Sequence, residues 1–325
     1  SESAAKRLKQ IQKKLSGNPE LAREIAAAVK ILKTAKDPGL RFATACRIMA
    51  KIREQLTNIR QANLRLAAVD ASLAIEIEQY TAGRALMEQL AGASRRERLQ
   101  WLRDSSFAVY GAGLISAIQL QDLQAAFAKV DGKATSLETY KAALDYLARV
   151  PGWGGQWLRF HFDDSKRKLT EIEPLADRVI QDVLRGGPLF FFSNVLDSLL
   201  RDANHLVGLR HELFGRDVGA GLRSLNPGLA RGKIRLKSAG QHQDFDPQGI
   251  YLLPETIAEL PPVAGILTAG EGNPLSHVQL LARNLGIPNV TVDENLIPEL
   301  TDYEGQKVIL AASPAGSVQL MLDTG

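Results

Sequence analysis

The chain has 325 residues, of which 45% are hydrophobic and 23% are charged, with 40 basic and 36 acidic side chains. This balance is typical of a soluble globular protein, and no apolar run approaches the ~20 residues that a membrane-spanning helix needs, so we expect no membrane association. The net charge of +4 is spread along the chain, which gives little reason to expect nucleic-acid binding. Cys46 is the single cysteine, which excludes an intramolecular disulfide framework and favours a reducing, cytoplasmic location.

The length and the first residues bear on domain organisation. A chain of 325 residues fits two domains, since one domain typically takes ~100 to 200 residues. The start, SESAAKRLKQ, contains no apolar segment typical of a secretory signal and has no initiator methionine. We therefore expect a piece of a longer or processed protein.

Residues 3 to about 215 are rich in Ala, Leu, Lys, Glu, Gln and Arg and contain few runs of β-branched residues, which predicts helices. Within this region, residue pairs recur at seven-residue intervals from Phe42 and Ala45 to Asn63 and Leu66, and they are apolar except at Asn63. Such a spacing predicts a helix face that is buried in a bundle.

Four clusters of Gly, Pro and helix-capping residues divide this region into several helices. They are Ser16–Pro19, Asp37–Gly39, Asp131–Gly132 and Pro151–Gly152. Trp153 and Trp157 follow the last cluster, and we interpret them as part of a packed loop between helices rather than as a sugar-stacking site. Asp163 and Asp164 are interpreted as a helix cap rather than as a metal site.

Two later features are also interpreted as structural. His205 and His211 are too far apart to form the i, i+4 pair with which one helical face binds a metal. Leu189–Phe192 forms a compact apolar cluster, which burial in a domain core explains.

After Gly215, Pro and Gly become frequent, and short apolar segments alternate with turn signals. These segments are Ile250–Leu253, Val263–Leu267 and Val308–Ala311. The predicted fold class is therefore α+β and multidomain, with an all-α domain over residues 1–216 followed by a small α/β domain over residues 217–325. We place a hinge between Arg216 and Pro227, where glycines interrupt the helical pattern.

The segment from Val263 to Val290 carries signals for a strand, a glycine-rich loop, a helix, a turn and a second strand. Gly270 and Gly272 let the backbone turn sharply after the first strand. Ser276 is well placed near the start of the helix, which we expect to end at Leu285.

This arrangement would set His277 at a helix N-terminus. The unpaired backbone N–H groups and the positive end of the helix dipole favour an anionic phosphoryl group there. Imidazole is nucleophilic near neutral pH and forms a labile P–N bond, so it suits a relay that accepts and returns a phosphoryl group.

The same segment resembles the phosphohistidine signature of phosphoenolpyruvate synthase, pyruvate phosphate dikinase, rifampin phosphotransferase and glucan, water dikinase. The matching residues are Gly272, Leu275–His277, Ala282–Arg283 and Leu285–Pro288. Asn273 stands in place of the usual second glycine of the loop. The resemblance implies that the α/β domain is a swivelling phosphohistidine domain and that His277 carries the phosphoryl group.

The resemblance also implies a mechanism and a set of partners. An ATP-grasp nucleotide-binding domain phosphorylates the histidine from ATP with Mg²⁺, after which the mobile domain delivers the group to an acceptor such as pyruvate, a glucan or another small molecule. Gly272, Ser276 and Arg283 are expected to support His277. No ATP-grasp domain is evident in this chain, so we expect an incomplete dikinase-type phosphotransferase, a phosphoryl carrier that binds neither ATP nor a metal itself.

Two alternatives stay open. The chain could be a non-catalytic interaction module in which the histidine is unused. It could also resemble enzyme I of the sugar phosphotransferase system, which passes the phosphoryl group to a carrier protein. In enzyme I the helical subdomain is inserted within the phosphohistidine domain, whereas here the helical region precedes the whole α/β unit.

Overall fold

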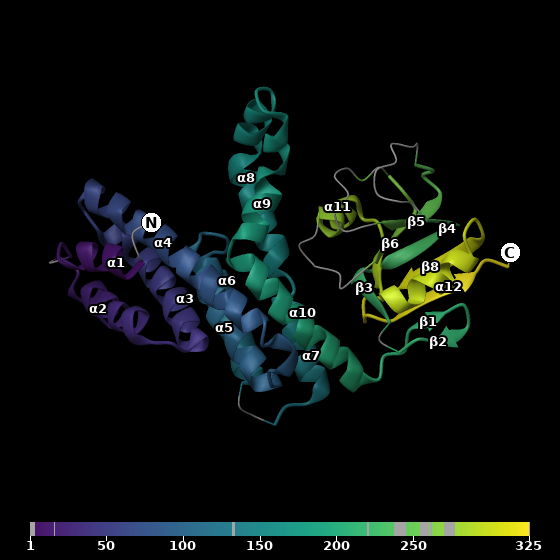
Figure 1. The fold of residues 1–325 in the computed structure, drawn as a ribbon, viewed down its shortest axis with the longest axis horizontal. Helices are drawn as coiled ribbons and strands as arrows, with labels where there is room; N and C mark the ends of the chain where they lie inside the picture. Colours follow the sequence, from purple (N-terminus) through teal and green to yellow (C-terminus); the bar gives the residue numbers. More distant parts are fainter. Residues whose placement is uncertain are drawn as a thin grey trace. The chain divides into compact units, whose positions relative to one another are not determined.

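The computed structural model describes residues 4–15, 17–131, 134–219, 221–236, 245–253, 260, 262–269 and 277–324, with only the backbone described at His277, Leu280 and Asn284. The chain divides into two compact units, Ser1–Leu200 and Arg201–Gly325. The first unit is helical and the second is built on a sheet (Figure 1), which confirms the expected α+β, multidomain fold class. No helix in these described ranges is long and apolar enough to cross a membrane.

The helical unit follows the expected succession of helices and short connections. Its helices are α1 (Ala4–Gln12), α2 (Pro19–Thr34), α3 (Pro38–Gln55), η1 (Leu56–Asn58), α4 (Ala62–Met87), η2 (Leu90–Gly92), α5 (Arg95–Gly111), α6 (Ala117–Val130), α7 (Leu137–Leu147), α8 (Val150–Thr170), η3 (Pro174–Arg178), α9 (Val179–Gly186) and α10 (Pro188–Val207). The last of these extends past the division into the second unit.

The predicted helix starts agree with the caps in the structure. The side chains of Asn18 and Asp37 accept hydrogen bonds from the backbone N–H groups of Leu21 and Leu40, and a proline follows each cap at the first helical position. Asp131 is the C-cap of α6. The side chains of Asn18 and Asp37 thereby satisfy backbone N–H groups that the start of a helix otherwise leaves unpaired.

The seven-residue apolar pattern is only partly a single helix face. Phe42 and Ala45 are fully buried in α3, as predicted. The pattern then crosses the break between α3 and α4, and Leu66 is 67% exposed. Ile59, just after η1, is still buried, but the prediction was wrong from Asn63 onward, because the chain turns at η1 and the residues of α4 that continue the spacing are exposed.

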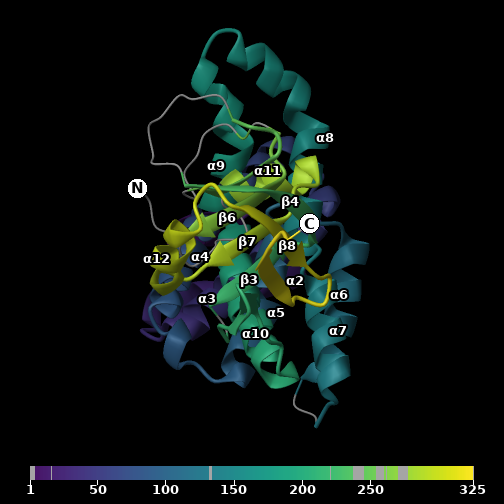
Figure 2. The same ribbon diagram turned by 90° about the vertical axis from the view of Figure 1, so that its right-hand side faces the viewer.

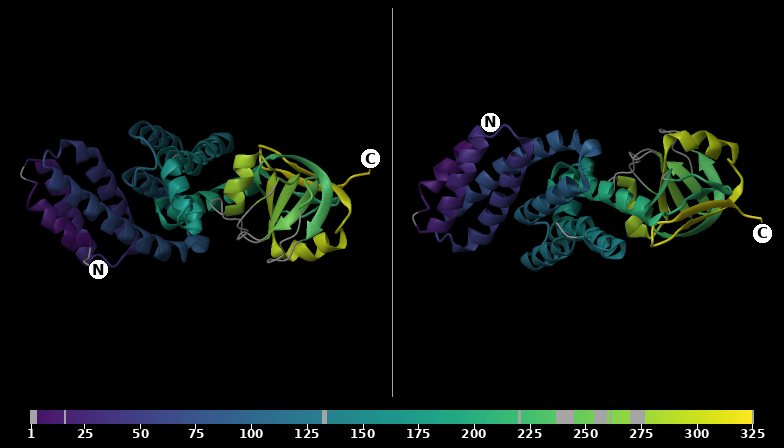
Figure 3. Two further views of the ribbon diagram at one scale, coloured as in Figure 1. Left: turned by 90° about the horizontal axis from the view of Figure 1, so that it is seen from above. Right: turned by 90° about the horizontal axis from the view of Figure 1, so that it is seen from below.

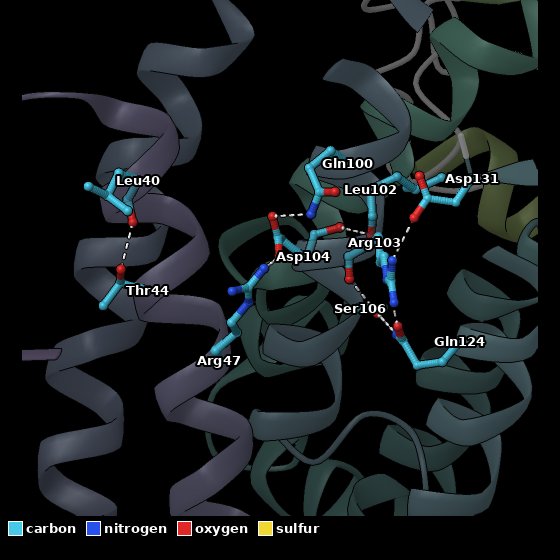
Figure 4. A network of polar contacts seen from close by, with 11 residues as sticks. Leu40, Thr44, Arg47, Gln100, Leu102, Arg103, Asp104, Ser106, Gln124 and Asp131 are labelled. Atoms are coloured by element: carbon cyan, nitrogen blue, oxygen red, sulfur yellow. Dashed lines mark hydrogen bonds and ion pairs between the residues drawn. The ribbon is translucent and has the colours of Figure 1, made fainter. Parts of the chain in front are cut away.

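A polar network joins α3, α5 and α6 beside the apolar core (Figure 4). Asp104 of α5 is buried, and its carboxylate accepts hydrogen bonds from Arg47 Nη2 and Gln100 Nε2, both at 2.9 Å. On the neighbouring side of α5, Arg103 Nε donates to Gln124 Oε1 of α6 at 3.0 Å. A buried carboxylate needs such partners, so this network is structural.

The helices α8 and α9 pack against each other and project away from the other helices of the first unit (Figure 1). Trp153 and Trp157 lie inside α8, so their expected place in an interhelical loop was wrong. Asp163 and Asp164 lie in the interior of the same helix, not at a cap, and Asp164 forms ion pairs with nearby basic residues of α8. By contrast, the predicted burial of the 189–192 cluster is confirmed, because three of its four side chains are buried.

The second unit contains a mixed sheet. Its strands are β1 (Glu212–Leu213), β2 (Arg216–Asp217), β3 (Leu222–Asn226), β4 (Gly228–Leu236), β5 (Gly249–Leu253), β6 (Gly265–Ala269), β7 (Asn289–Val292), β8 (Lys307–Ala312) and β9 (Val318–Leu322). The strand order is β2-β1-β9-β8-β4-β5-β6-β7-β3, and β4, β5, β6 and β7 are mutually parallel neighbours. The sheet is curved (Figure 3), and β3 at one end of the order contacts β9 near the other.

The alternation of side chains along the strands builds a core on each face of the sheet. Ile250, Leu267 and Val290 belong to one apolar cluster, together with Leu300 of α12 (Ile297–Asp302). Ile266 belongs to the opposite cluster, which also contains apolar residues of α11 (His277–Leu285). Each face therefore has its own covering helix, α12 on one and α11 on the other.

The division between the units lies earlier than the boundary at residues 216 and 217 that the sequence suggested. The reason is that β1 pairs in parallel with β9, with Glu212 opposite Gln319, so residues before 217 already belong to the sheet. The expected hinge also falls inside the second unit, since β2 and β3 occupy much of the segment from Arg216 to Pro227.

Candidate functional site

The strand–helix–strand unit that the motif predicted is formed by β6, α11 and β7. Residues of β6 and β7 pair in parallel, with Ala269 opposite Val292. In such a unit the connecting helix begins near the carboxyl ends of the strands, where α/β folds commonly place ligands. His277 is the first described residue of α11, and its expected position at a helix N-terminus stays a prediction.

The end of α11 is also as expected. Gly286 follows the helix with a φ of +68°, a left-handed conformation that glycine adopts without the steric cost of a side chain. Ile287 N–H then donates to the Ala282 carbonyl at 2.9 Å, which satisfies one of the last carbonyls of the helix. Gly272 and Ser276, like the His277 side chain, lie outside the described residues.

Apolar contacts hold the inner face of α11 on the sheet. Val278 and Ala282 are fully buried and pack in one cluster with Ile266 of β6 and Tyr251 of β5. Figures 1 and 2 both show α11 beside β6. The apolar face of the helix therefore determines which side of α11 meets the sheet.

A chain of three buried polar side chains crosses this apolar interface. Thr268 Oγ1 donates to Asn289 Oδ1 at 2.8 Å, and Asn289 Nδ2 donates to Gln279 Oε1 at 2.6 Å. Gln279 Nε2 in turn donates to the backbone carbonyl of Leu225 in β3 at 2.8 Å. Thr268, Asn289 and Gln279 are all 0% exposed, so the network links β6, β7, β3 and α11 in the interior.

The comparisons with known proteins bear on this same segment. Residues 250–313 match the family model described as PEP-utilising enzyme, mobile domain. The second unit contains a mobile domain of the PEP-utilising enzyme family. The match includes β5, β6, α11 and β7, and it agrees with the resemblance carried by the motif around His277. Comparisons of the chain with curated proteins and with solved structures gave no match.

Arg283 lies on α11 of the mobile domain, six residues after His277. The helix rise of about 1.5 Å per residue separates the two Cα atoms by about 9 Å along the axis. The Arg283 side chain is half-buried, and burial lowers the pKa of its guanidinium from the usual value. Within the described residues its side chain has no hydrogen bond or ion pair, so its supporting role stays a prediction.

A separate cavity of about 790 Å³ lies elsewhere in the second unit. It is lined by residues of α10 and of the segment 208–211 that follows it, by Asp217, Gly219 and residues 221–223, and by Thr291 and residues 293–295, and by no described residue of α11. His205 and His211 both border it, but the Nδ1 atom of buried His211 accepts a hydrogen bond from the Val318 backbone N–H at 3.1 Å. That bond gives His211, which directly precedes β1, a structural role because it joins this part of the chain to β9.

The network formed by Thr268, Asn289 and Gln279 was not predicted from the sequence. Its signal was present, because each of these polar residues interrupts a segment that is otherwise apolar. Their convergence depends on the register of β6 against β7 and on the rotation of α11, which the spacing of the residues does not specify.

Proposed function

We propose that this protein is the phosphoryl-carrier part of an ATP-dependent phosphotransferase. His277 of the mobile domain accepts a phosphoryl group and passes it to an acceptor at a second site. The observation that supports the proposal most strongly is the coincidence of the family match over residues 250–313 with a histidine at the N-terminus of the helix between two parallel strands.

The proposed phosphorylation joins a nitrogen of the His277 imidazole to phosphorus. The bond between that phosphorus and an oxygen of the leaving nucleotide breaks, and the imidazole proton passes to solvent. ATP with Mg²⁺ on an ATP-grasp domain supplies the phosphoryl group and neutralises its charge. The backbone N–H groups at the start of α11 then stabilise the phosphoryl group that His277 holds.

The second transfer reverses this chemistry on a new nucleophile. An oxygen of the acceptor attacks phosphorus, the P–N bond breaks, and the imidazole takes up a proton. The enolate oxygen of pyruvate and the hydroxyl oxygens of a glucan or another small molecule can all attack phosphorus, so the imidazole chemistry does not choose among these acceptors. The proposed place of action is the cytoplasm, where ATP is available and the free thiol of Cys46 stays reduced.

A chemical donor tests the carrier role on this chain alone. Phosphoramidate transfers its phosphoryl group to a nucleophilic imidazole and releases ammonia, so it needs no nucleotide domain. We expect His277 to be labelled about 2- to 5-fold faster than an exposed histidine, because the helix terminus attracts the anionic donor. Peptide mapping under alkaline conditions, which preserve phosphohistidine, measures the rate at each of the five histidines.

The chain supplies its own controls for this measurement. His161 and His205 are exposed and lie on helices, so they report the reactivity of an unassisted imidazole. His277→Ala removes the expected label and leaves the labelling of these two residues unchanged. Labelling of His277 no faster than that of His161 would contradict the carrier proposal and favour an interaction module whose histidine is unused.

A further inference from the structure

The buried network on α11 includes residues on both sides of segment 270–276, which precedes His277. Thr268 is next to the last residue of β6, just before residues 270–276, and Gln279 follows His277 by two positions on α11. Asn289, at the start of β7, joins the two by hydrogen bonds of 2.8 and 2.6 Å. The network therefore ties the strand before segment 270–276 directly to the helix after it.

The direction of each hydrogen bond in the network is fixed by chemistry. The Thr268 hydroxyl donates to the Asn289 carbonyl oxygen, the Asn289 amide donates to the Gln279 carbonyl oxygen, and the Gln279 amide donates to a backbone carbonyl. The last acceptor, Leu225, belongs to β3 and cannot rotate away. A single arrangement of the side chains thus satisfies these groups, which specifies one rotation and one axial position of α11.

Apolar packing alone would hold α11 less specifically. The surrounding contacts, made by Val278, Ala282 and Ile287, exclude water but have no directional preference. Burying three polar side chains in such an interface is costly unless every group is paired. The presence of these three polar side chains indicates that they fix the position of α11 rather than strengthen its attachment to the sheet.

We propose that Thr268, Asn289 and Gln279 are positioning residues that fix α11, and with it His277, for transfer of a phosphoryl group from a protein-bound donor. This inference rests on the proposed function, because it assigns a role toward phosphorylation of His277. In-line transfer from an enzyme-bound nucleotide needs the acceptor nitrogen to be placed within about 0.5 Å. A small donor that diffuses freely has no such requirement.

Comparing the two kinds of donor distinguishes an effect on the position of His277 from an effect on the fold or on the reactivity of the imidazole. The rate of His277 labelling is measured in Thr268→Val twice, first with phosphoramidate and then, in the full-length protein, with radiolabelled ATP and Mg²⁺. We expect the phosphoramidate rate to stay at the wild-type value and the ATP-driven rate to fall by about 10- to 100-fold, as misplacement of a reacting group by about 1 Å does. Thr268→Ser keeps the hydroxyl donor and should restore the ATP-driven rate.

Two matched controls exist in the chain. Thr291 lies opposite Thr268 in the register of β7 against β6 and is similarly buried, but within the described residues its side chain makes no hydrogen bond. Gln279→Met is compared with Gln79→Met in α4, since Gln79 is 1% exposed and its amide has no partner among the described residues. Thr291→Val and Gln79→Met should leave both labelling rates unchanged, whereas Gln279→Met should behave like Thr268→Val.

Three results would overturn the positioning role. One is an ATP-driven rate in Thr268→Val equal to that of the wild type. Another is an equal fall of the phosphoramidate rate, which would show that the substitution disturbs the fold or the imidazole itself. The third is an equal effect of Thr291→Val. Failure of wild-type His277 to react with either donor would instead contradict the proposed function.

Discussion

Burial determines the protonation state of His211. This imidazole is 4% exposed, and its Nδ1 atom accepts the Val318 N–H, so the neutral form is the one that fits the structure. Burial lowers the pKa of His211, the nearby Asp217 carboxylate partly offsets this effect, and His205 lowers the pKa further. The folded second unit therefore resists protonation of His211 more than the unfolded chain does.

This difference predicts how stability depends on pH. The folded pKa of His211 lies below its ordinary value of 6.5, so its contribution to stability is complete above that pH. As the pH falls below about 6.5 the unfolded chain binds a proton first, and the second unit loses stability until the folded pKa is passed. Urea unfolding of the second unit, followed through its amide NMR signals at several pH values, measures the slope.

His211→Gln provides the control, because an amide oxygen can accept the Val318 N–H but does not titrate. We expect this variant to lose the component of the pH dependence between pH 6.5 and the folded pKa of His211. An unchanged slope would show that another group is responsible.

The single-residue predictions differ in whether they depend on neighbours in the chain or on contacts between distant segments. The place of His277 on α11 was predicted from residues next to it in the chain, and α11 is described from His277 onward. The partners of Thr268 and Gln279 follow from strand register and helix rotation. A local pattern carries the first kind of information but not the second.

Two glycines lie where helices of the first unit approach each other closely. Gly154 lies in α8, where an added Cβ would come within 2.5 Å of a Leu189 side-chain carbon. The glycine-rich segment that resembled a loop is helical because the absence of a side chain lets α10 approach. Tertiary contact there outweighs the low helix propensity of glycine.

Gly111 gives a direct test of such a close approach. It ends α5 where that helix crosses α3, and an added Cβ would lie 2.6 Å from Met49 Cβ and 2.9 Å from the Ala50 backbone nitrogen. We expect Gly111→Ala to lower the free energy of unfolding of the helical unit by about 1–3 kcal/mol, since backbone must shift to make room. Tryptophan fluorescence in a urea titration reports this unit, because all three tryptophans lie within residues 101–157.

Gly186→Ala is the matched control, because Gly186 ends α9 and a Cβ there would meet nothing within 4 Å. This substitution should be neutral or should raise stability by about 0.5–1 kcal/mol, through the smaller conformational entropy of alanine in the unfolded chain. Equal effects of the two substitutions would contradict the close approach of α5 to α3.

Breaks between helices were predicted only where the sequence contains Gly, Pro or helix-capping residues. Asn18 and Asp37 cap helices as their residue types suggested. The break between α3 and α4 has neither glycine nor proline in η1. The seven-residue apolar spacing therefore predicted one continuous buried face across this break. Burial of the chain on both sides, rather than a local breaker, determines where this helix ends.

For the whole molecule, the two units were predicted from a change in residue usage, and their division was misplaced. The sheet begins with β1, a strand of two residues that pairs with β9 more than a hundred positions later in the chain. A strand this short leaves almost no pattern in the sequence. The family match, in contrast, lies wholly within the second unit and within the α/β domain as first delimited.

In the proposed function, His277 carries a phosphoryl group between two sites. Its most direct test is to incubate the full-length protein with radiolabelled ATP and Mg²⁺, map the label under alkaline conditions, and then add a candidate acceptor. We predict acid-labile label on the peptide that contains His277, none in His277→Ala, and loss of the label to the correct acceptor. Label of equal amount in His277→Ala, or no label in the wild type, would show that His277 is not the phosphoryl carrier.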